Sequence, residues 1–402
     1  MFADIPRPLA RARVGVSATF LLYGTILGTW TARIPAIKQK LALSDGHLSI
    51  ALLAFAAGAI IGMQTSGPIV DRLRSTKVMV PAVFADGLAL IAPAYSVNLA
   101  TLAVGLLVFG TVHGMLNVAM NVNAVEIQRA WGRPIISSCH AIYSIGGFIG
   151  AAIGGGFAYA HLGATATFVS TAALVVFVAA LTTRWVAVPP GAEVAAVPAE
   201  AAPAGLGAAP LRGVLFLGVL AFCCLVGEGA AADWSAVYLR DNLHTTAGFA
   251  ATAYAVFALM MTAGRSVGDQ LALRLGPVRL VQVSGLLASA GLAICLLVDE
   301  PIAGVLGFGC LGAGLSCIAP QVFSAAGNRH PARAGNAIAR VASLGFLGFV
   351  VGPVVIGSTA QVVGLPKALA IPALLALFVA LAAPALRTPA AKTPEPWEHV
   401  LQ

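Results

Sequence analysis

Charged side chains are scarce in this sequence of 402 residues: only 9% are charged, whereas 59% are hydrophobic. Soluble domains contain about 25% charged residues, so the composition excludes an ordinary soluble protein. The ten-residue alternation typical of transmembrane β-strands is also missing from the sequence. Instead, apolar runs of roughly 20 residues recur, and this length lets an α-helix cross a hydrocarbon core of ~30 Å. We therefore expect an all-α membrane protein whose helices span a lipid bilayer.

Cysteine is rare and catalytic motifs are missing. The six cysteines all lie inside apolar runs, without paired loop spacing or metal-binding spacing, so we expect reduced packing residues. The sequence contains no Gly-x-x-x-x-Gly-Lys-Ser/Thr loop, which argues against ATP hydrolysis. No zinc-site or catalytic-triad spacing stands out either. We therefore predict no enzymatic activity, no metal and no cofactor.

Twelve apolar spans divide into two sets of six. They lie at approximately 14–32, 47–70, 78–96, 99–125, 135–160, 163–186, 211–235, 246–266, 278–298, 302–327, 337–361 and 365–386. The sequence between the sixth and seventh spans is rich in Ala and Pro, which is typical of a flexible tether. We therefore expect an N-terminal half over 1–186, a linker over 187–210 and a C-terminal half over 211–402.

The basic residues predict the orientation of the chain. If the N-terminus is cytoplasmic, 18 of the 23 Lys and Arg residues fall on the cytoplasmic side and 5 on the other. This asymmetry is the positive-inside signal, and it explains the net charge of +8 without a nucleic-acid partner. We therefore expect both termini in the cytoplasm. One chain suffices for such a fold, so we expect a monomer.

The two halves repeat each other in sequence. GPIVDRLR, with Asp71 after the second span, is matched by RSVGDQLALR, with Asp269 after the eighth. Ser144 in the fifth span is similarly matched by Ser343 in the eleventh. Two six-helix halves of equal polarity form a parallel repeat, and such repeats usually place a substrate site near the midplane between the halves.

With this repeat, the chain resembles the major facilitator superfamily of transporters. The loop motif of that family is matched at Gly67, Asp71 and Arg72, whereas Arg74 occupies a position where Gly is expected. WTARIPAIKQKLALS (30–44), GEGAAADWSAVYL (227–239) and GRSVGDQLALRLGPVRL (264–280) resemble the YbjJ-type branch, near rhizopine and fucose permeases. The resemblance implies the major facilitator fold, alternating access and a small-molecule substrate. It also implies a gating role for Asp71, Arg72 and Asp269.

Acidic residues inside the spans are candidates for proton coupling. A charge within a span costs at least ~2.5–3.5 kcal/mol, so it should face a cavity or a partner. Glu228 interrupts an apolar run about 24 Å from the inner end of its helix. It either binds the coupling proton or forms a packing or gating contact, for example with Arg33 or Arg240. Asp86 is a second candidate for coupling, and Asp233 lies nearer the outer interface as a solvated or paired gating residue.

Polar side chains on single helix faces predict a substrate site. His113, Asn117 and Asn121 follow at i, i+4 and i+8, and therefore share one face. Amides both donate and accept hydrogen bonds, so this face suits a ligand with hydroxyl groups, although interhelical hydrogen bonding gives the same pattern. In the fifth span, His140 and Ser144 also share a face, and His140 is the third candidate for coupling because histidine titrates near neutral pH.

Further candidates lie on other spans. Tyr23 and Trp30 form an aromatic face that could stack on a sugar ring, whereas Trp30 also fits an interfacial belt. Gln321 adds an amide, and Arg340 either binds an anion or extends to the cytoplasmic interface. Arg33 breaks the charge asymmetry on the outer side and is a gating candidate.

These observations favour a proton-coupled secondary transporter for a small polar, sugar-like solute. An efflux antiporter is the alternative, because Gly146, Gly150, Gly154 and Gly155 fit an exporter pattern in which Ala151 replaces a proline. A membrane sensor that binds but does not transport is a third possibility. Loss of the proton gradient would abolish solute movement by a transporter and leave binding by a sensor intact.

Overall fold

The computed structural model describes residues 6–186, 208–329 and 331–387, and these residues form helices joined by short turns. The first half contains α1 (Arg7–Lys40), α2 (Asp45–Leu73), α3 (Ser75–Ala89), α4 (Leu99–Trp131), α5 (Ile136–Tyr159) and α6 (Ala164–Thr182). The second half contains α7 (Ala208–Val237), α8 (Ala247–Val298), α9 (Pro301–Leu315), α10 (Ile318–Arg329), α11 (Ala334–Val363), α12 (Leu365–Ala368) and α13 (Ala370–Ala382). The expected all-α fold is confirmed.

These helices account for the twelve predicted spans. Eleven helical stretches of the described chain are long and apolar enough to cross a membrane, and one of them covers nearly all of the 52-residue α8. Gly276 interrupts α8 with a φ of 73°, a backbone conformation that glycine adopts at little steric cost. α8 therefore consists of two consecutive spans, whereas α9 with α10, and α12 with α13, each form one.

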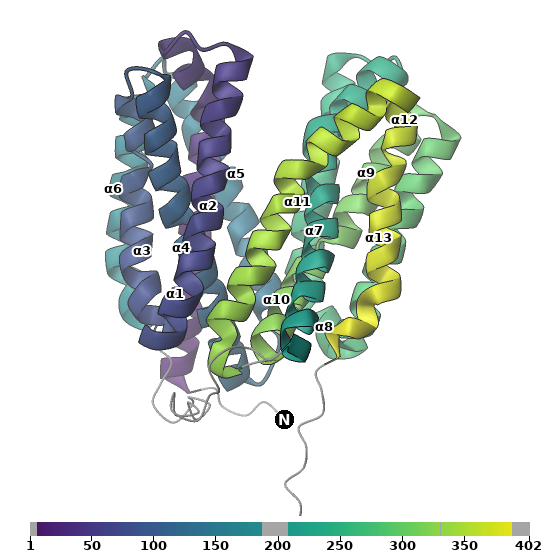
Figure 1. The fold of residues 1–402 in the computed structure, drawn as a ribbon. Helices are drawn as coiled ribbons and strands as arrows, with labels where there is room; N and C mark the ends of the chain where they lie inside the picture. Colours follow the sequence, from purple (N-terminus) through teal and green to yellow (C-terminus); the bar gives the residue numbers. More distant parts are fainter. Residues whose placement is uncertain (1–5, 187–207, 330, 388–402) are drawn as a thin grey trace, which may run out of the picture.

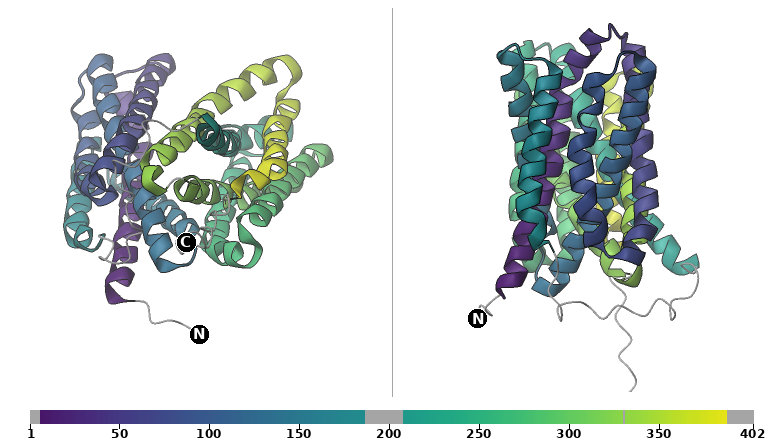
Figure 2. Two further views of the ribbon diagram at one scale, coloured as in Figure 1. Left: turned by 60° about the horizontal axis from the view of Figure 1, so that its bottom comes forward. Right: turned by 90° about the vertical axis from the view of Figure 1, so that its left-hand side faces the viewer.

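The two halves lie side by side and diverge toward one end (Figure 1). The helix ends that flank the connection between the halves, after α6 and before α7, lie at the bottom of that view, and we call this side the linker end. α2 packs against α11 and α5 against α8, and these four helices form most of the contact between the halves, to which α4 and α10 also contribute. Figure 2 shows the same arrangement from two other directions.

Glycine-rich faces hold the helices of each half together. A Cβ atom on Gly24 of α1 would lie 2.1 Å from the backbone oxygen of Tyr143 on α5, and one on Gly62 of α2 would lie 1.9 Å from that of Thr111 on α4. In the second half, a Cβ on Gly348 would lie 2.4 Å from the oxygen of Phe222. These distances are too short for any side chain, so the glycines permit close contact between helix backbones.

The repeat between the halves extends to the conformation of the turns. The Ser44 hydroxyl accepts a hydrogen bond at the start of α2, and Thr246 does the same at the start of α8. Arg74 ends α2 with a φ of 77°, which is close to the value at Gly276. Arg74 therefore adopts a conformation suited to glycine, which explains physically why a glycine is expected at this position.

Candidate functional site

Asp71 joins the two halves at the linker end. It lies near the end of α2, and its two carboxylate oxygens accept hydrogen bonds from the backbone N–H groups of Gly335 and Asn336, at 2.7 and 3.1 Å. The side-chain amide of Asn336 donates a third bond at 2.5 Å. Because Gly335 and Asn336 begin α11, Asp71 accepts hydrogen bonds from N–H groups that have no partner within that helix. Its negative charge also interacts favourably with the positive end of the helix dipole.

Asp269 makes the equivalent contact in the other direction. It lies on α8, and its carboxylate accepts hydrogen bonds from the N–H groups of Ser137 and Ser138, at 2.9 and 3.0 Å. These two residues belong to the first turn of α5. Each half therefore supplies one aspartate that caps a helix of the opposite half, and we call these two contacts the reciprocal caps.

Further polar contacts at the linker end reinforce the reciprocal caps. Gln128 of α4 donates to the Ser324 hydroxyl of α10 at 2.7 Å. Arg129 donates to the side-chain oxygen of Asn328 at 2.8 Å and also to the backbone oxygen of Gly327. The described contacts between the halves thus include hydrogen bonds from α2, α4 and α8 at this end.

Glu228 lies at the contact between the halves, beside a buried arginine. One oxygen of Glu228, on α7, lies 3.6 Å from a guanidinium nitrogen of Arg265 on α8, and the Arg265 side chain is 7% exposed. Arg265 also donates to the hydroxyl of Ser144 on α5 at 2.8 Å. The Glu228 side chain is 25% exposed. An acid of the second half is therefore linked through one cation to a hydroxyl of the first half, and we call these three residues the Glu228 cluster.

A line of polar side chains continues from this cluster into the first half. The Ser144 hydroxyl donates to the backbone oxygen of His140, whose Nε2 lies 3.3 Å from Oδ1 of Asn121. The Asn121 amide donates to the backbone oxygen of Asn117, and the Asn117 amide donates to the Tyr23 hydroxyl at 3.1 Å. The structure thus brings together five of the polar residues predicted for the site.

Asp86 and His113 form a buried pair behind this line. Nδ1 of His113 lies 2.9 Å from Oδ2 of Asp86, and the two side chains are 3% and 0% exposed. The Tyr23 ring stacks on the imidazole, with centroids 3.8 Å apart and planes at 10°. His113, expected on a substrate-facing surface, is instead covered by Tyr23 in this structure.

The remaining candidates lie apart from the Glu228 cluster. Trp30 is 3% exposed and packs near the rings of Phe109 and Phe168, so its ring is enclosed within the first half rather than open to a solute. Arg33 is also buried and donates to the backbone oxygen of Leu162 at 2.6 Å, which differs from the acidic partner considered above.

The polar candidates at the linker end and at the opposite end also differ in exposure. Asp233 and Arg72 are exposed, and Arg340 is half-buried, with a guanidinium nitrogen that is enclosed and without a hydrogen-bond partner. Arg240 pairs with its neighbour Asp241 at 2.7 Å rather than with Glu228. Gln321 is buried at the linker end, beside a hollow of about 200 Å³ that Ser324 and Asn328 also line.

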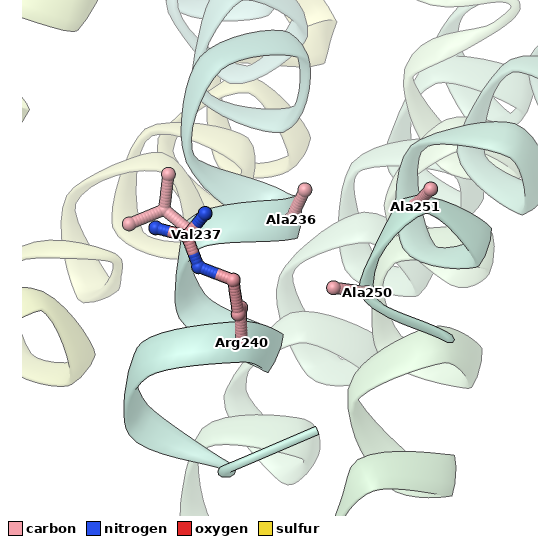
Figure 3. Close-up of a pocket in the computed structure, with 5 residues that line it drawn as sticks. All are labelled: Ala236, Val237, Arg240, Ala250 and Ala251. Atoms are coloured by element: carbon pink, nitrogen blue, oxygen red, sulfur yellow. The ribbon is translucent and has the colours of Figure 1, made fainter. Parts of the chain in front are cut away.

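A second hollow, of about 130 Å³, lies at the C-terminal end of α7. It is lined by Ala236 and Val237 at the end of α7, by Arg240 just after that helix, and by Ala250 and Ala251 of α8 (Figure 3). Its lining is mostly apolar and includes none of the Glu228 cluster. We therefore base the candidate site on the polar contacts between the halves.

Arg265 is the functional candidate that sequence reasoning missed. It is one of the 18 basic residues that the charge asymmetry assigns to the cytoplasmic side, although the predicted span 246–266 contains it. The structure places it inside α8, where it forms an ion pair with Glu228 and donates a hydrogen bond to Ser144. A basic residue at the edge of a predicted span, together with an unexplained acid in another span, is the signal that could have identified the pair.

Comparison with known proteins identifies the family. The model of the Major Facilitator Superfamily matches residues 15–336 and 234–401, which together include most of the chain. The chain belongs to the major facilitator superfamily. An MFS-type transporter of Yersinia pestis is 32% identical over 382 residues, which cover 94% of this chain and 97% of that protein. The membrane protein MosC of Rhizobium meliloti is 29% identical and covers 88% of this chain and 85% of its own length.

Solved structures of other superfamily members share the fold. The transporter FucP in its outward conformation superposes with a TM-score of 0.78 at 19% identity, over 95% of this chain and 100% of that chain. The proton:xylose symporter XylE gives a TM-score of 0.71 at 12% identity, over 93% and 94% of the two chains. This superfamily consists of membrane transporters of small molecules, so the prediction that the chain is not an enzyme is confirmed.

Proposed function

We propose that this chain is a proton-driven carrier for a small polar, sugar-like solute, which it moves across the bacterial inner membrane by alternating access. The chain acts as a monomer with its linker end in the cytoplasm. In this proposal, the reciprocal caps of Asp71 and Asp269 hold the cytoplasmic side closed. Opening that side requires both aspartates to release the helix ends of the opposite half.

The Glu228 cluster supports proton coupling. An ionised Glu228 attracts Arg265, and a proton on Glu228 removes that attraction. Arg265 also donates to Ser144 of the other half, so the charge on Glu228 changes the balance of contacts across the interface. This direct link from a titratable acid to a contact between the halves is the observation on which the proposal rests.

The neighbouring residues favour an uncharged, hydroxyl-rich solute. The side chains of Asn117, Asn121, His140 and Ser144 offer both donors and acceptors, as sugar hydroxyls require. Tyr23 adds an aromatic surface beside Asn117. Two structurally similar members of the superfamily are described as a fucose:proton symporter and a proton:xylose symporter, which is in keeping with this class of solute.

The test is solute-driven proton movement in proteoliposomes that contain the full chain. A panel of monosaccharides and polyols, with cationic drugs as the efflux comparison, would be added while internal pH is recorded. We expect a sugar to move protons in the same direction as itself, and Glu228→Gln to abolish proton movement but retain solute binding. Asp233→Asn is the matched control, because Asp233 is an exposed acid on the same helix.

Two results would contradict the proposal. Protons that move opposite to a drug would identify an efflux antiporter, which is the alternative function. Normal proton movement by the Glu228→Gln variant would show that Glu228 has only a structural role.

A further inference from the structure

We propose that Asp86 and His113 form a second proton-binding site, enclosed within the first half and closed off by Tyr23. This inference deepens the proposed function, because it assumes that protons drive transport. It concerns a different group from Glu228, on α3 and α4 rather than α7. It also gives His113 a role in proton binding in place of direct solute contact.

The geometry of the pair suits a proton-binding site that is closed to water. Asp86 and His113 share one short contact of 2.9 Å, while Oδ1 of Asp86 and Nε2 of His113 are buried without any hydrogen-bond partner. A structural contact between helices would ordinarily satisfy these atoms, because an unsatisfied buried polar group costs free energy. Two orphaned atoms on one buried pair therefore indicate a function beyond packing.

The surroundings of the pair are aromatic and apolar. The ring of Tyr23 from α1 covers one face of the imidazole, and the rings of Phe55 from α2 and Phe109 from α4 lie 5.7 and 5.8 Å away. On the α6 side, Val175 lies against Gly87, the residue after Asp86. Among the described side chains that contact the pair, Tyr23 is the titratable one, and Tyr143 of α5 lies behind it at 5.6 Å between ring centroids.

In these surroundings, the access of water determines whether the pair keeps or loses its proton. With one exchangeable proton bound, the pair has no net charge, as either an aspartic acid beside neutral histidine or an aspartate beside histidinium. Loss of that proton leaves a net negative charge, which is costly in an apolar enclosure without a basic partner. The closed site therefore retains its proton, whereas entry of water stabilises the charged form and permits release.

Tyr23 connects this site to the solute-facing residues. Its ring covers His113, and its hydroxyl accepts a hydrogen bond from the half-buried Asn117. A solute that binds Asn117 competes for this hydrogen bond and so acts on the ring that encloses the pair. Tyr23 is thus a positioning residue in our proposal, since it links solute binding to water access without itself binding the proton.

The direct test is pH-dependent infrared difference spectroscopy of the purified full chain in lipid. We expect a carbonyl band from a protonated carboxyl group that disappears at alkaline pH, together with an imidazole band. Asp86→Asn should remove the carboxyl band, His113→Gln should alter both bands, and Glu228→Gln should leave the Asp86 band in place. Tyr23→Phe retains the ring, and should preserve the band while removing its response to the solute that the proteoliposome panel identifies.

Transport provides the second readout. Asp86→Asn should lose proton-driven solute accumulation while exchange of labelled for unlabelled solute persists, because exchange requires binding but no net proton transfer. A pH difference spectrum that Asp86→Asn leaves unchanged would overturn the proposal, as would wild-type accumulation by this variant. If Glu228→Gln transports protons normally but the Asp86 band is present, the role of Glu228 fails and the second site remains.

Discussion

Removing the reciprocal caps should open the linker end of the protein. Asp71 and Asp269 each accept two backbone hydrogen bonds from the first turn of a helix in the opposite half. The contacts break when the halves separate at this end, so they stabilise only the closed arrangement. The variants are Asp71→Ala, Asp269→Ala and the double substitution.

The magnitude follows from the geometry of the caps. Replacing a capping side chain by alanine costs about 0.5–2 kcal/mol, and both aspartates are partly exposed, so we take ~1.4 kcal/mol for each. That value shifts an equilibrium about tenfold. Both caps act on the same equilibrium at separate contacts, so the double variant should shift it by roughly 100-fold. Asp71→Ala should exceed Asp269→Ala, because Asp71 also accepts a bond from the Asn336 side chain.

The measurement is the distance distribution between spin labels on either side of the linker end. Lys77 at the start of α3 and Arg274 on α8 are exposed and belong to opposite halves, so Lys77→Cys and Arg274→Cys provide the labelling sites. Five of the six native cysteines are buried. We expect the longer-distance population to grow with each substitution, whereas Asp233→Ala at the opposite end leaves it unchanged. An unchanged distribution in the double variant would refute the reasoning.

Two further predictions concern stability. Arg74→Gly should raise the unfolding temperature, because a non-glycine residue at a φ of 77° is strained and glycine is not. The expected gain in the free energy of unfolding is about 1 kcal/mol, and Arg74→Ala should not reproduce it. A lower unfolding temperature for Arg74→Gly would contradict this reasoning. Gly62→Val should prevent stable folding, seen as loss of a monodisperse peak in size-exclusion chromatography, because even its Cβ would lie 1.9 Å from a backbone oxygen of α4. Gly147→Ala, where an added Cβ meets nothing within 4 Å, should behave as the wild type.

The spans could be predicted from the sequence because they depend on composition along a single helix. Apolar runs of sufficient length identify the twelve spans, and Gly276 with Pro277 explains why α8 is interrupted after the eighth span. The same holds for the glycine-rich faces, because pairs such as Gly24 with Gly28 and Gly58 with Gly62 recur at a spacing of four residues in the sequence. The partners of Asp71 and Asp269 could not be found this way. They are backbone N–H groups, which any residue at the start of α11 or α5 would supply.

The candidate site was less predictable because its contacts join helices that are distant in sequence. The spacing of His113, Asn117 and Asn121 places them on one face but says nothing of the neighbouring helix. The structure shows Tyr23 over His113, with Asp86 behind it, and these partners decide which residues reach the interface. Trp30 illustrates the same limit, since its position near a helix end is compatible with an exposed aromatic belt or an enclosed ring.

The two proposed proton sites differ in a way that suits a carrier. Glu228 is 25% exposed and pairs with a cation whose other partner lies across the interface, whereas Asp86 is fully buried inside one half. A proton on Glu228 therefore changes the contact between the halves directly, while a proton at Asp86 is retained until Tyr23 moves. Asn117, which we propose as part of the solute face, lies between the two sites. Protons would thus be loaded and released at different groups. We infer that solute binding controls the Asp86–His113 site, whereas the proton gradient across the membrane controls protonation of Glu228.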